Sequence, residues 1–326
     1  MEPRGKAGRS WISRPDEAFT VEALRTRLIG AGASWRDYPP SLRLWFILVP
    51  VLTAAIGGLL RFIRLEVPHK LVFDETYYVK DAYSYLISGY ERSWPDKAND
   101  SFNTGNPDVL LNTPEYVVHP PVGKWMIAAG MWLFGPENPF GWRFAAALTG
   151  TLTVLLVSLI ALKLFRSLPL AGAAGLLLAV DGHHLVMSRT SLLDIFLTFW
   201  TLAAFGALLL DRDDGRRRLA ARLARAAAAN GGQPPAGALL SGPWLGVRWW
   251  RVAAGICMGL AVGTKWSGLF FLAGFGILTV LWDLNARRVA GIRGWISGGV
   301  IRDGIPAFLG MVPVAGIVYS ATWTGW

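Results

Sequence analysis

The sequence predicts an all-α protein that crosses a membrane several times. Hydrophobic residues make up 53% of the chain and the mean hydropathy is +0.38, whereas charged residues account for only 17%. A soluble globular domain carries about 25% charged residues, so this composition is typical of an integral membrane protein. The apolar residues gather in runs whose lengths are close to the roughly 20 residues that one bilayer span requires. The 16 tryptophans agree, because tryptophan favours the boundary between membrane and water.

Seven apolar stretches reach or approach the length of a span. They cover residues 43–63, 141–163, 169–187, 191–210, 250–264, 266–284 and 305–323. The fifth is short and glycine-rich, which makes it the weakest of the seven. The first forty residues are polar and show no cleavable signal peptide, so Leu44–Leu60 is expected to act as an uncleaved start-transfer helix. Before it, the weakly amphipathic stretch Asp16–Ile29 predicts a short helix that is either solvated or on the membrane surface.

Basic residues indicate how the spans are oriented. A net charge of +10 could indicate nucleic-acid binding, but most basic residues lie in short connections between apolar stretches, so no nucleic-acid partner is expected. With seven spans these connections share one side, which the positive-inside rule identifies as the cytoplasm. The residues concerned are Arg36, Arg43, Lys163, Arg166, Arg212, Arg216, Arg217, Arg218, Arg222, Arg225, Arg287, Arg288, Arg293 and Arg302. Arg61, Arg64 and Lys70 are exceptions on the outer side.

The connections divide the chain into a cytoplasmic N-terminal extension, residues 1–40, and one membrane-embedded domain, residues 41–326. The external segment 64–140 is long, polar and aromatic-rich, and loops of this length in compact proteins tend to be functional. By contrast, the Arg/Ala-rich and then Gly/Pro-rich loop 211–249 is expected to be a flexible cytoplasmic connection. The sequence stops at Trp326 directly after an apolar run, which suggests a truncated membrane domain.

Ionisable residues near the outer ends of the spans are candidates for a functional site, because charges are costly at a membrane boundary. On the seven-span topology they gather on the external side, whereas another topology would distribute them over both sides. The cluster comprises Asp74, Glu75, His119, Arg143, His183, His184, Arg189, Asp194 and Lys265.

The acid pair Asp74–Glu75 suits a reaction that removes a proton from a hydroxyl. A neighbouring carboxylate or a partly apolar setting raises the pKa of one acid and makes it a stronger base. The alternative is a helix cap, because FDETYYVKDAYSYL has the pattern of a helix with acids in its first turn. No cofactor is required, although an acid pair could bind a divalent cation weakly. The sequence contains no HExxH or comparable metal-ligand spacing.

The other candidates also have two interpretations each. His119 precedes two prolines in VVHPPVGKW, a stiff segment that either holds a loop over a site or simply turns into a helix. Arg189 and Asp194 in SRTSLLDIFL either contact substrate or join two helices as an ion pair. Lys265 in AVGTKWSGLFF either attracts a lipid phosphate or extends to the interface beside Trp266.

Five segments together resemble the protein O-mannosyltransferases, in particular their actinobacterial branch. They are FDETYYVKDAYSYL, VHPPVGKWMIAAGMWLFG, FGWRFAAALTG, SRTSLLDIFLTFW and GLAVGTKWSGLF, and they follow the family's order over residues 74–271. The resemblance implies a GT-C type membrane fold. It also implies further spans and another long external loop beyond those in this chain.

The resemblance implies transfer of mannose from polyprenyl-phosphate mannose to Ser or Thr hydroxyls of proteins exported through the Sec translocon. The family's acidic pair falls on Asp74 and Glu75, and Asp74 is implied as the base of an inverting displacement. The family's arginine near the second span falls on Arg143. A cation such as Arg143, Arg189 or Lys265 is expected to neutralise the leaving phosphate. The expected location is the cell membrane, with the site on its external face.

Two other classes of function fit the same features. One is a GT-C transferase that acts on a glycolipid acceptor, which would use the same acids and the same type of donor. The other is a transporter or a non-catalytic membrane scaffold. Transporters concentrate charge near the middle of the bilayer rather than at one mouth, so this class is the less favoured.

Overall fold

The structure is a computed structural model and describes residues 18–30 and 39–325. These residues form helices and one isolated antiparallel β-bridge, between Arg92 and Pro114. The elements are α1 (Val21–Ile29), α2 (Pro40–Phe62), α3 (Glu75–Ser88), α4 (Ala98–Asn103), α5 (Val122–Phe134), α6 (Pro139–Phe165), α7 (Leu168–Val180), α8 (Gly182–Arg189), α9 (Leu193–Ala228), α10 (Ala236–Ser241), α11 (Trp249–Val262), α12 (Gly268–Val289), α13 (Trp295–Gly299), the π-helical turn η2 (Val300–Gly304) and α14 (Ile305–Ala321). The predicted all-α class is confirmed.

In the described part of the chain, five helical segments are long and apolar enough to cross a membrane. They are α2, α6, α9, α12 and the run Trp295–Ala321 from α13 to α14. Helices α7 and α8 are separated by a bend of 59°. Counted together as one broken span, they make a sixth segment. The expected fifth span falls on α11, which has 14 residues. At about 1.5 Å per residue such a helix is shorter than the about 30 Å hydrocarbon layer, so the seven-span count stays a prediction.

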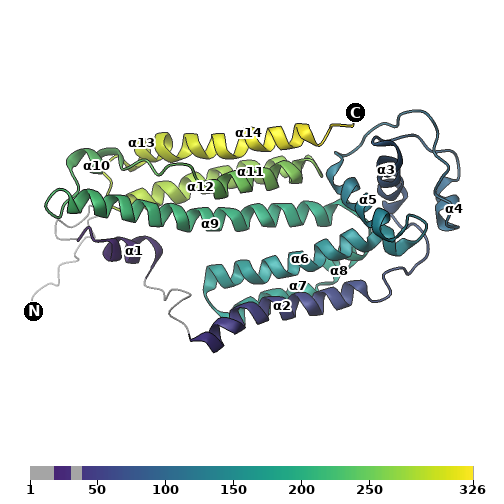
Figure 1. Ribbon diagram of the computed structural model, residues 1–326, viewed down its shortest axis with the longest axis horizontal. Coiled ribbons are helices and arrows are strands. Elements are labelled where there is room, and N and C mark those ends of the chain that lie inside the picture. Colours follow the sequence, from purple (N-terminus) through teal and green to yellow (C-terminus); the bar gives the residue numbers. More distant parts are fainter. Residues whose placement is uncertain (1–17, 31–38, 326) are drawn as a thin grey trace, which may run out of the picture. The chain divides into compact units, whose positions relative to one another are not determined.

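The chain forms two compact units, which we describe separately. Of the described residues, unit 1 contains 18–30, Leu210–Arg248 and Gly276–Phe308, and unit 2 contains 39–209, Trp249–Phe275 and 309–325. Within unit 2, α2, α6 and α7 pack against one another, and Figure 1 shows α3, α4 and α5 gathered beyond one end of these helices. The segment 64–140 therefore contains three helices, and one of them, α3, lies where FDETYYVKDAYSYL has a helical pattern.

Local sequence signals explain where the helices of unit 2 begin and end. Helix α6 starts after Asn138, whose side chain accepts a hydrogen bond from the backbone of Gly141 at 3.1 Å, and Pro139 occupies its first position. The bend between α7 and α8 lies at Asp181, which caps α8 by accepting from His184 N at 2.7 Å. Helix α3 ends at Gly89, whose backbone is left-handed.

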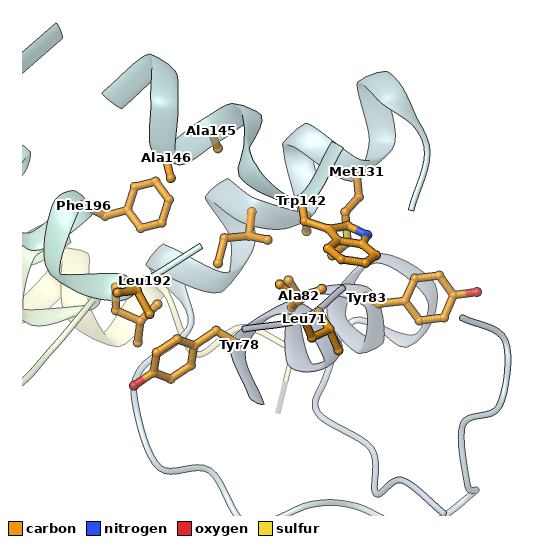
Figure 2. Packing of buried hydrophobic residues seen from close by; sticks show 14 of the residues in the cluster. Leu71, Tyr78, Ala82, Tyr83, Met131, Trp142, Ala145, Ala146, Leu192 and Phe196 are labelled. Carbon is orange, nitrogen blue, oxygen red and sulfur yellow. The ribbon is translucent and has the colours of Figure 1, made fainter. Parts of the chain in front are cut away.

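An apolar core holds α3, α5, α6 and the first turn of α9 together in unit 2. Val79, Met131, Trp142 and Phe196 are almost completely buried in it. Tyr78 belongs to the same core, and Figure 2 shows its hydroxyl pointing away from the packed side chains. This packing fixes the N-terminal end of α3, where the acid pair lies.

Unit 1 differs from the sequence-based expectation. Helix α9 continues to Ala228, and α10 follows at Ala236–Ser241, so more than half of the segment expected as a flexible connection is helical. Alanine and arginine favour helices, and Leu219 and Leu223 lie one turn apart on the buried side of α9. Leu24 and Leu28 of α1 are buried in the same cluster, so α1 packs on protein rather than being merely solvated. The preceding residues 16 and 17 lie outside the described part of the chain.

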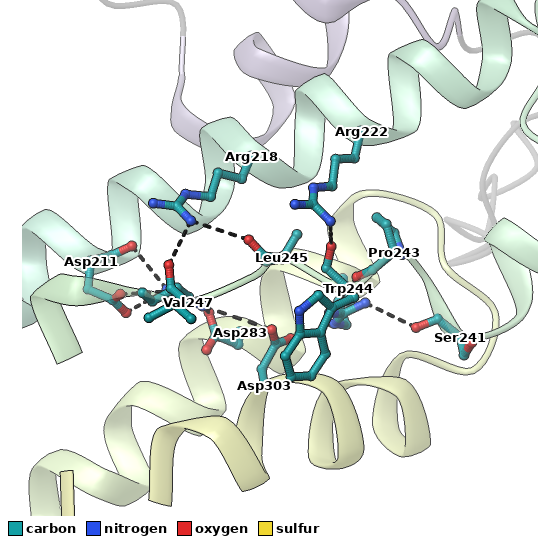
Figure 3. A network of polar contacts seen from close by, with 12 residues as sticks. Asp211, Arg218, Arg222, Ser241, Pro243, Trp244, Leu245, Val247, Asp283 and Asp303 are labelled. Atoms are coloured by element: carbon teal, nitrogen blue, oxygen red, sulfur yellow. Dashed lines mark hydrogen bonds and ion pairs between the residues drawn. The ribbon is translucent and has the colours of Figure 1, made fainter. Parts of the chain in front are cut away.

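A buried polar network crosses unit 1 (Figure 3). The guanidinium of Arg248 donates to the carboxylate of Asp211 at 2.9 and 2.5 Å and to Asp283 at 2.9 Å. Arg287 donates to Asp303 at 2.5 Å and to the carbonyl of Ser241 at 3.0 Å. These bonds attach the loop before α11 to α9 and α12, so the two basic connections lie within one compact unit.

The network should make one aspartate of α9 far more important for stability than its neighbour. We expect Asp211→Asn to lower the free energy of unfolding by about 1.5–3 kcal/mol, because it weakens a buried charged hydrogen bond. Asp214→Asn removes only the half-exposed contact with Arg218 at 2.8 Å and should cost about 0.5 kcal/mol or less. Thermal unfolding of both variants in detergent measures the difference. Equal effects would contradict the prediction.

Candidate functional site

Five ionisable side chains lie near one another in unit 2, and we call them the Asp74 cluster. Asp74 and Tyr78 belong to the start of α3, His119 to the segment before α5, Asp194 to the first turn of α9, and Lys265 to the turn after α11. The Tyr78 ring centre is 5.9 Å from that of His119, and Lys265 Nζ is 2.8 and 3.0 Å from the two carboxylate oxygens of Asp194. Both carboxylates act electrostatically on Tyr78 and on His119, which joins the two groups into one cluster.

The carboxylate of Asp74 is not used as a helix cap. Asp74 occupies the N-cap position of α3, but its side chain accepts no capping hydrogen bond from the helix. The hydroxyl of Tyr78, one turn later, donates to Asp74 Oδ2 over a long distance of 3.5 Å. Asp74 is partly exposed, so its carboxylate is accessible to another molecule.

Tyr78 is a site residue that the sequence reasoning missed. Burial raises the pKa of its hydroxyl, and the charges of Asp74 and Asp194 raise it further. The phenol therefore keeps its proton at neutral pH and remains a hydrogen-bond donor toward Asp74. Its spacing was an available signal, because residues four apart on a helix face each other.

His119 is half-buried and lies beside Tyr78 in the Asp74 cluster. Burial lowers the pKa of its imidazole, and the charges of Lys265 and Lys124 lower it further. The ring is therefore neutral at neutral pH and can exchange hydrogen bonds without adding a charge.

Asp194 and Lys265 form an ion pair across 71 residues of sequence. Their side chains are 49% and 22% exposed, so both groups can still reach a ligand. The alternative partner for Asp194 suggested by the sequence, Arg189, is bound elsewhere.

Glu75 has a different environment from its neighbour Asp74. It is completely buried, and its carboxylate accepts two hydrogen bonds from Arg143, each at 2.8 Å. It also accepts hydrogen bonds from the backbone N–H groups of Val72 and Ser191, each at 3.0 Å. Arg143 in turn donates to the carbonyls of residues 65, 68 and 70 at 3.0–3.2 Å. The pair therefore fastens the loop before α3 to α6 and to the start of α9.

Two further arginines bind backbone carbonyls rather than the cluster. Arg189 donates to the carbonyls of residues 60, 61, 63 and 64 at 2.8–3.0 Å and so closes the end of α2. Arg61 is fully buried and contacts His184 Nδ1 at 2.6 Å. His183 is exposed, on the first turn of α8. Of the cations proposed from the sequence, only Lys265 joins the Asp74 cluster.

The arrangement combines a proton acceptor, a neutral hydrogen-bonding ring and a paired lysine on a partly open surface. Such a set can remove a proton from a hydroxyl at Asp74 while Lys265 attracts an anion nearby. Among the described residues no three carboxylate, imidazole or thiol groups approach one another as metal ligands, so a weakly bound divalent cation at the acid pair stays a prediction.

Known proteins are similar to this chain in sequence and in fold. A protein of Mycobacterium tuberculosis named polyprenol-phosphate-mannose–protein mannosyltransferase is 40% identical over 296 residues, which cover 89% of this chain and 51% of that protein. A Corynebacterium glutamicum protein of the same name is 38% identical over 255 residues, covering 78% of this chain and 45% of that protein. The chain thus spans about half the length of these curated relatives.

The structure of the Saccharomyces cerevisiae protein O-mannosyltransferase complex bound to the sugar donor superposes with a TM-score of 0.60 at 19% identity. The match covers 94% of this chain and 35% of that chain, which shows a shared GT-C-like membrane fold. A sequence profile described as "Dolichyl-phosphate-mannose-protein mannosyltransferase" matches residues 51–219 and 241–310. The chain therefore belongs to the dolichyl-phosphate-mannose-protein mannosyltransferase family.

Proposed function

We propose that the protein transfers mannose from polyprenyl-phosphate mannose to Ser or Thr hydroxyls of exported polypeptides. The observation that carries the proposal is the carboxylate of Asp74, which lies at a helix start without capping it and shares a cluster with Lys265. The names of the mycobacterial and corynebacterial relatives supply the substrate class.

The proposed reaction is a single displacement at the anomeric carbon of mannose. The acceptor oxygen forms the new bond as the bond between that carbon and the phosphate oxygen breaks, so the configuration inverts. Asp74 takes the proton of the attacking hydroxyl, and the bonding electron pair leaves with polyprenyl phosphate. Tyr78 and His119 orient Asp74 and the acceptor without adding charge.

Lys265 is the cation that we assign to the departing phosphate. The donor is a phosphodiester with one negative charge, and its cleavage leaves a phosphate monoester with more charge. A fixed ammonium stabilises that gain most strongly where water is partly excluded. Arg143 and Arg189 are less suited, because carboxylate or carbonyl oxygens already occupy their guanidinium groups.

We further infer that the Asp74 cluster faces the exterior of the cell membrane and that the N-terminus lies in the cytoplasm. In support, the basic connections after the fourth and sixth expected spans lie together in unit 1, as a common side requires. The positive-inside rule then identifies that side as cytoplasmic. Delivery of acceptors by the Sec translocon belongs to the same proposal.

The proposal is tested with membranes that contain the full-length protein and radiolabelled polyprenyl-phosphate mannose. A peptide rich in Ser, Thr, Pro and Ala and a glycolipid extract are offered as competing acceptors. Label on the peptide is expected. Label only in the glycolipid would replace the protein acceptor with a lipid one, and no transfer to either would exclude a transferase.

Lys265 should affect the reaction of the donor more than the binding of the acceptor. We expect Lys265→Met to lower kcat/KM for the lipid donor about tenfold, mainly through kcat, because about 1.4 kcal/mol of charge stabilisation at the leaving phosphate is lost. KM for the peptide should change little. Lys97→Met, which removes an exposed charge near the start of α4, serves as the matched control. An unchanged kcat/KM for the donor in the Lys265 variant would contradict the assignment.

A further inference from the structure

A second group of charges is buried beside the Asp74 cluster, and the proposed reaction does not use it. Lys124 of α5 has its side chain 1% exposed and contacts Asp81 of α3 at 3.0 Å and Glu91 at 2.6 Å. Glu91 lies in the loop after α3 and is itself 1% exposed in its side chain. We call Asp81, Glu91 and Lys124 the buried triad.

The triad joins the elements that carry Asp74 and His119. Asp81 follows Asp74 by seven residues, so both lie on the same face of α3, two turns or about 10 Å apart. Lys124 follows His119 by five residues, just after α5 begins at Val122. The rings of Tyr78 and His119 contact each other between the level of Asp74 and the level of Asp81 and Lys124. Any shift of α3 along α5 would therefore change the distance from Asp74 to His119.

The two acids of the triad hold different parts of the chain. Asp81 binds Lys124 to α3 itself. Glu91 binds Lys124 to the following loop, and its backbone carbonyl accepts the N–H of Glu115 at 3.0 Å. Asp81, the acid on α3, can thus position the base Asp74. Glu91, the acid in the loop, holds a segment that is further from Asp74.

We propose that Asp81 and Lys124 are positioning residues for the transfer reaction: their buried ion pair fixes α3 against α5 and thereby the separation of Asp74 from His119. This inference rests on the proposed function. It assigns the pair no contact with either substrate.

Glu91, the second acid of the triad, has a titration that can be measured. Two carboxylates and one ammonium would leave a buried net negative charge, so one acid should hold a proton. Burial raises the pKa of Glu91 to about 7, and the charge of Asp81 adds to this effect, while Lys124 and Tyr85 oppose it. Lys80 and Glu115 are the other charged groups near the triad.

This pKa shift has a definite sign for stability. In the unfolded chain Glu91 loses its proton near its ordinary pKa of 4.5, whereas the folded chain keeps it until about pH 7. The folded state binds more protons over that range, so its stability falls as pH rises from about 4.5 to about 7. Glu91→Gln removes the titration. Its melting temperature should match the wild type at pH 4.5 and exceed it at pH 8.

The positioning role is tested by comparing Asp81→Asn with Glu91→Gln in the full-length protein. Each variant replaces one carboxylate by an amide and leaves Lys124 a single acidic partner. We expect Asp81→Asn to lower kcat for mannose transfer about ten- to a hundredfold with little change in KM, because small displacements of a reacting group cost this much. Glu91→Gln should stay within about threefold of the wild type at neutral pH, since its substitution leaves α3 attached.

Hydrogen exchange gives a readout that does not depend on activity. Backbone amides of α3 should exchange faster in Asp81→Asn than in Glu91→Gln. Equal kcat values for the two variants, or equal exchange, would overturn the positioning role. A wild-type protein that transfers no mannose would instead refute the proposed function, and the exchange comparison would still decide whether Asp81 holds α3.

Discussion

Asp74→Asn should abolish most mannose transfer while the protein still inserts and folds. A general base contributes about 100- to 10,000-fold to the rate of a reaction, and an amide cannot accept the proton. The substitution keeps the shape of the side chain, and Asp74 is neither a helix cap nor fully buried, so stability should change little. Initial rates with labelled lipid donor and peptide measure the effect on kcat.

A matched variant separates this effect from a general loss of acidic charge. Asp96→Asn removes an exposed carboxylate from the same segment between α2 and α6 and should leave the rate unchanged. Near-normal transfer by Asp74→Asn would refute the base assignment. In that case Asp194 would be the remaining partly exposed acid of the cluster to test.

Arg143→Met should destabilise unit 2 by about 3–5 kcal/mol, because it leaves the buried carboxylate of Glu75 without its counter-charge. The same change breaks the bonds to the carbonyls of the loop before α3. Activity should fall together with the folded fraction. Thermal unfolding in detergent measures the loss, and Arg64→Met, which removes an exposed arginine of the same region, is the control.

A second substitution shows whether the charge or the packing causes this loss. Arg143→Met combined with Glu75→Gln removes both charges, so the double variant should be more stable than Arg143→Met alone. The opposite order would mean that Glu75 does not need Arg143. It would also weaken the case that Glu75 supports Asp74 structurally and leaves the chemistry to it.

Of the nine ionisable residues that the sequence placed in one cluster, four belong to the Asp74 cluster, and the sequence did not predict which of them pair. The cost of charge near a span end pointed to Asp74, His119, Asp194 and Lys265, and the structure brings these four together. Pairing depends on contacts between distant segments, which no local pattern contains. Glu75 and Arg143, for example, are separated by 68 residues.

The turn between α8 and α9 explains why Arg189 does not form the ion pair with Asp194 that the sequence suggested. Arg189 and Asp194 are close in sequence, but one helix ends at Arg189 and the next begins at Leu193. The break directs Arg189 to the carbonyls at the end of α2 and leaves Asp194 to Lys265. The helical extension of α9 was more accessible to prediction, because RRRLAARLARAAAA combines strong helix formers with leucines at helical spacing.

The environment of Arg61 has a consequence for how the protein is made. Its guanidinium donates to the carbonyls of Gly57 in α2 and of Leu178 and Ala179 in α7, besides His184. Most of these partners are synthesised more than 100 residues after Arg61. A newly inserted α2 would present an unsatisfied arginine to lipid or draw it toward the headgroups. We therefore expect this end of α2 to reach its final depth only after α7 and α8 have entered the bilayer, so assembly of this region follows the insertion of α2 instead of accompanying it.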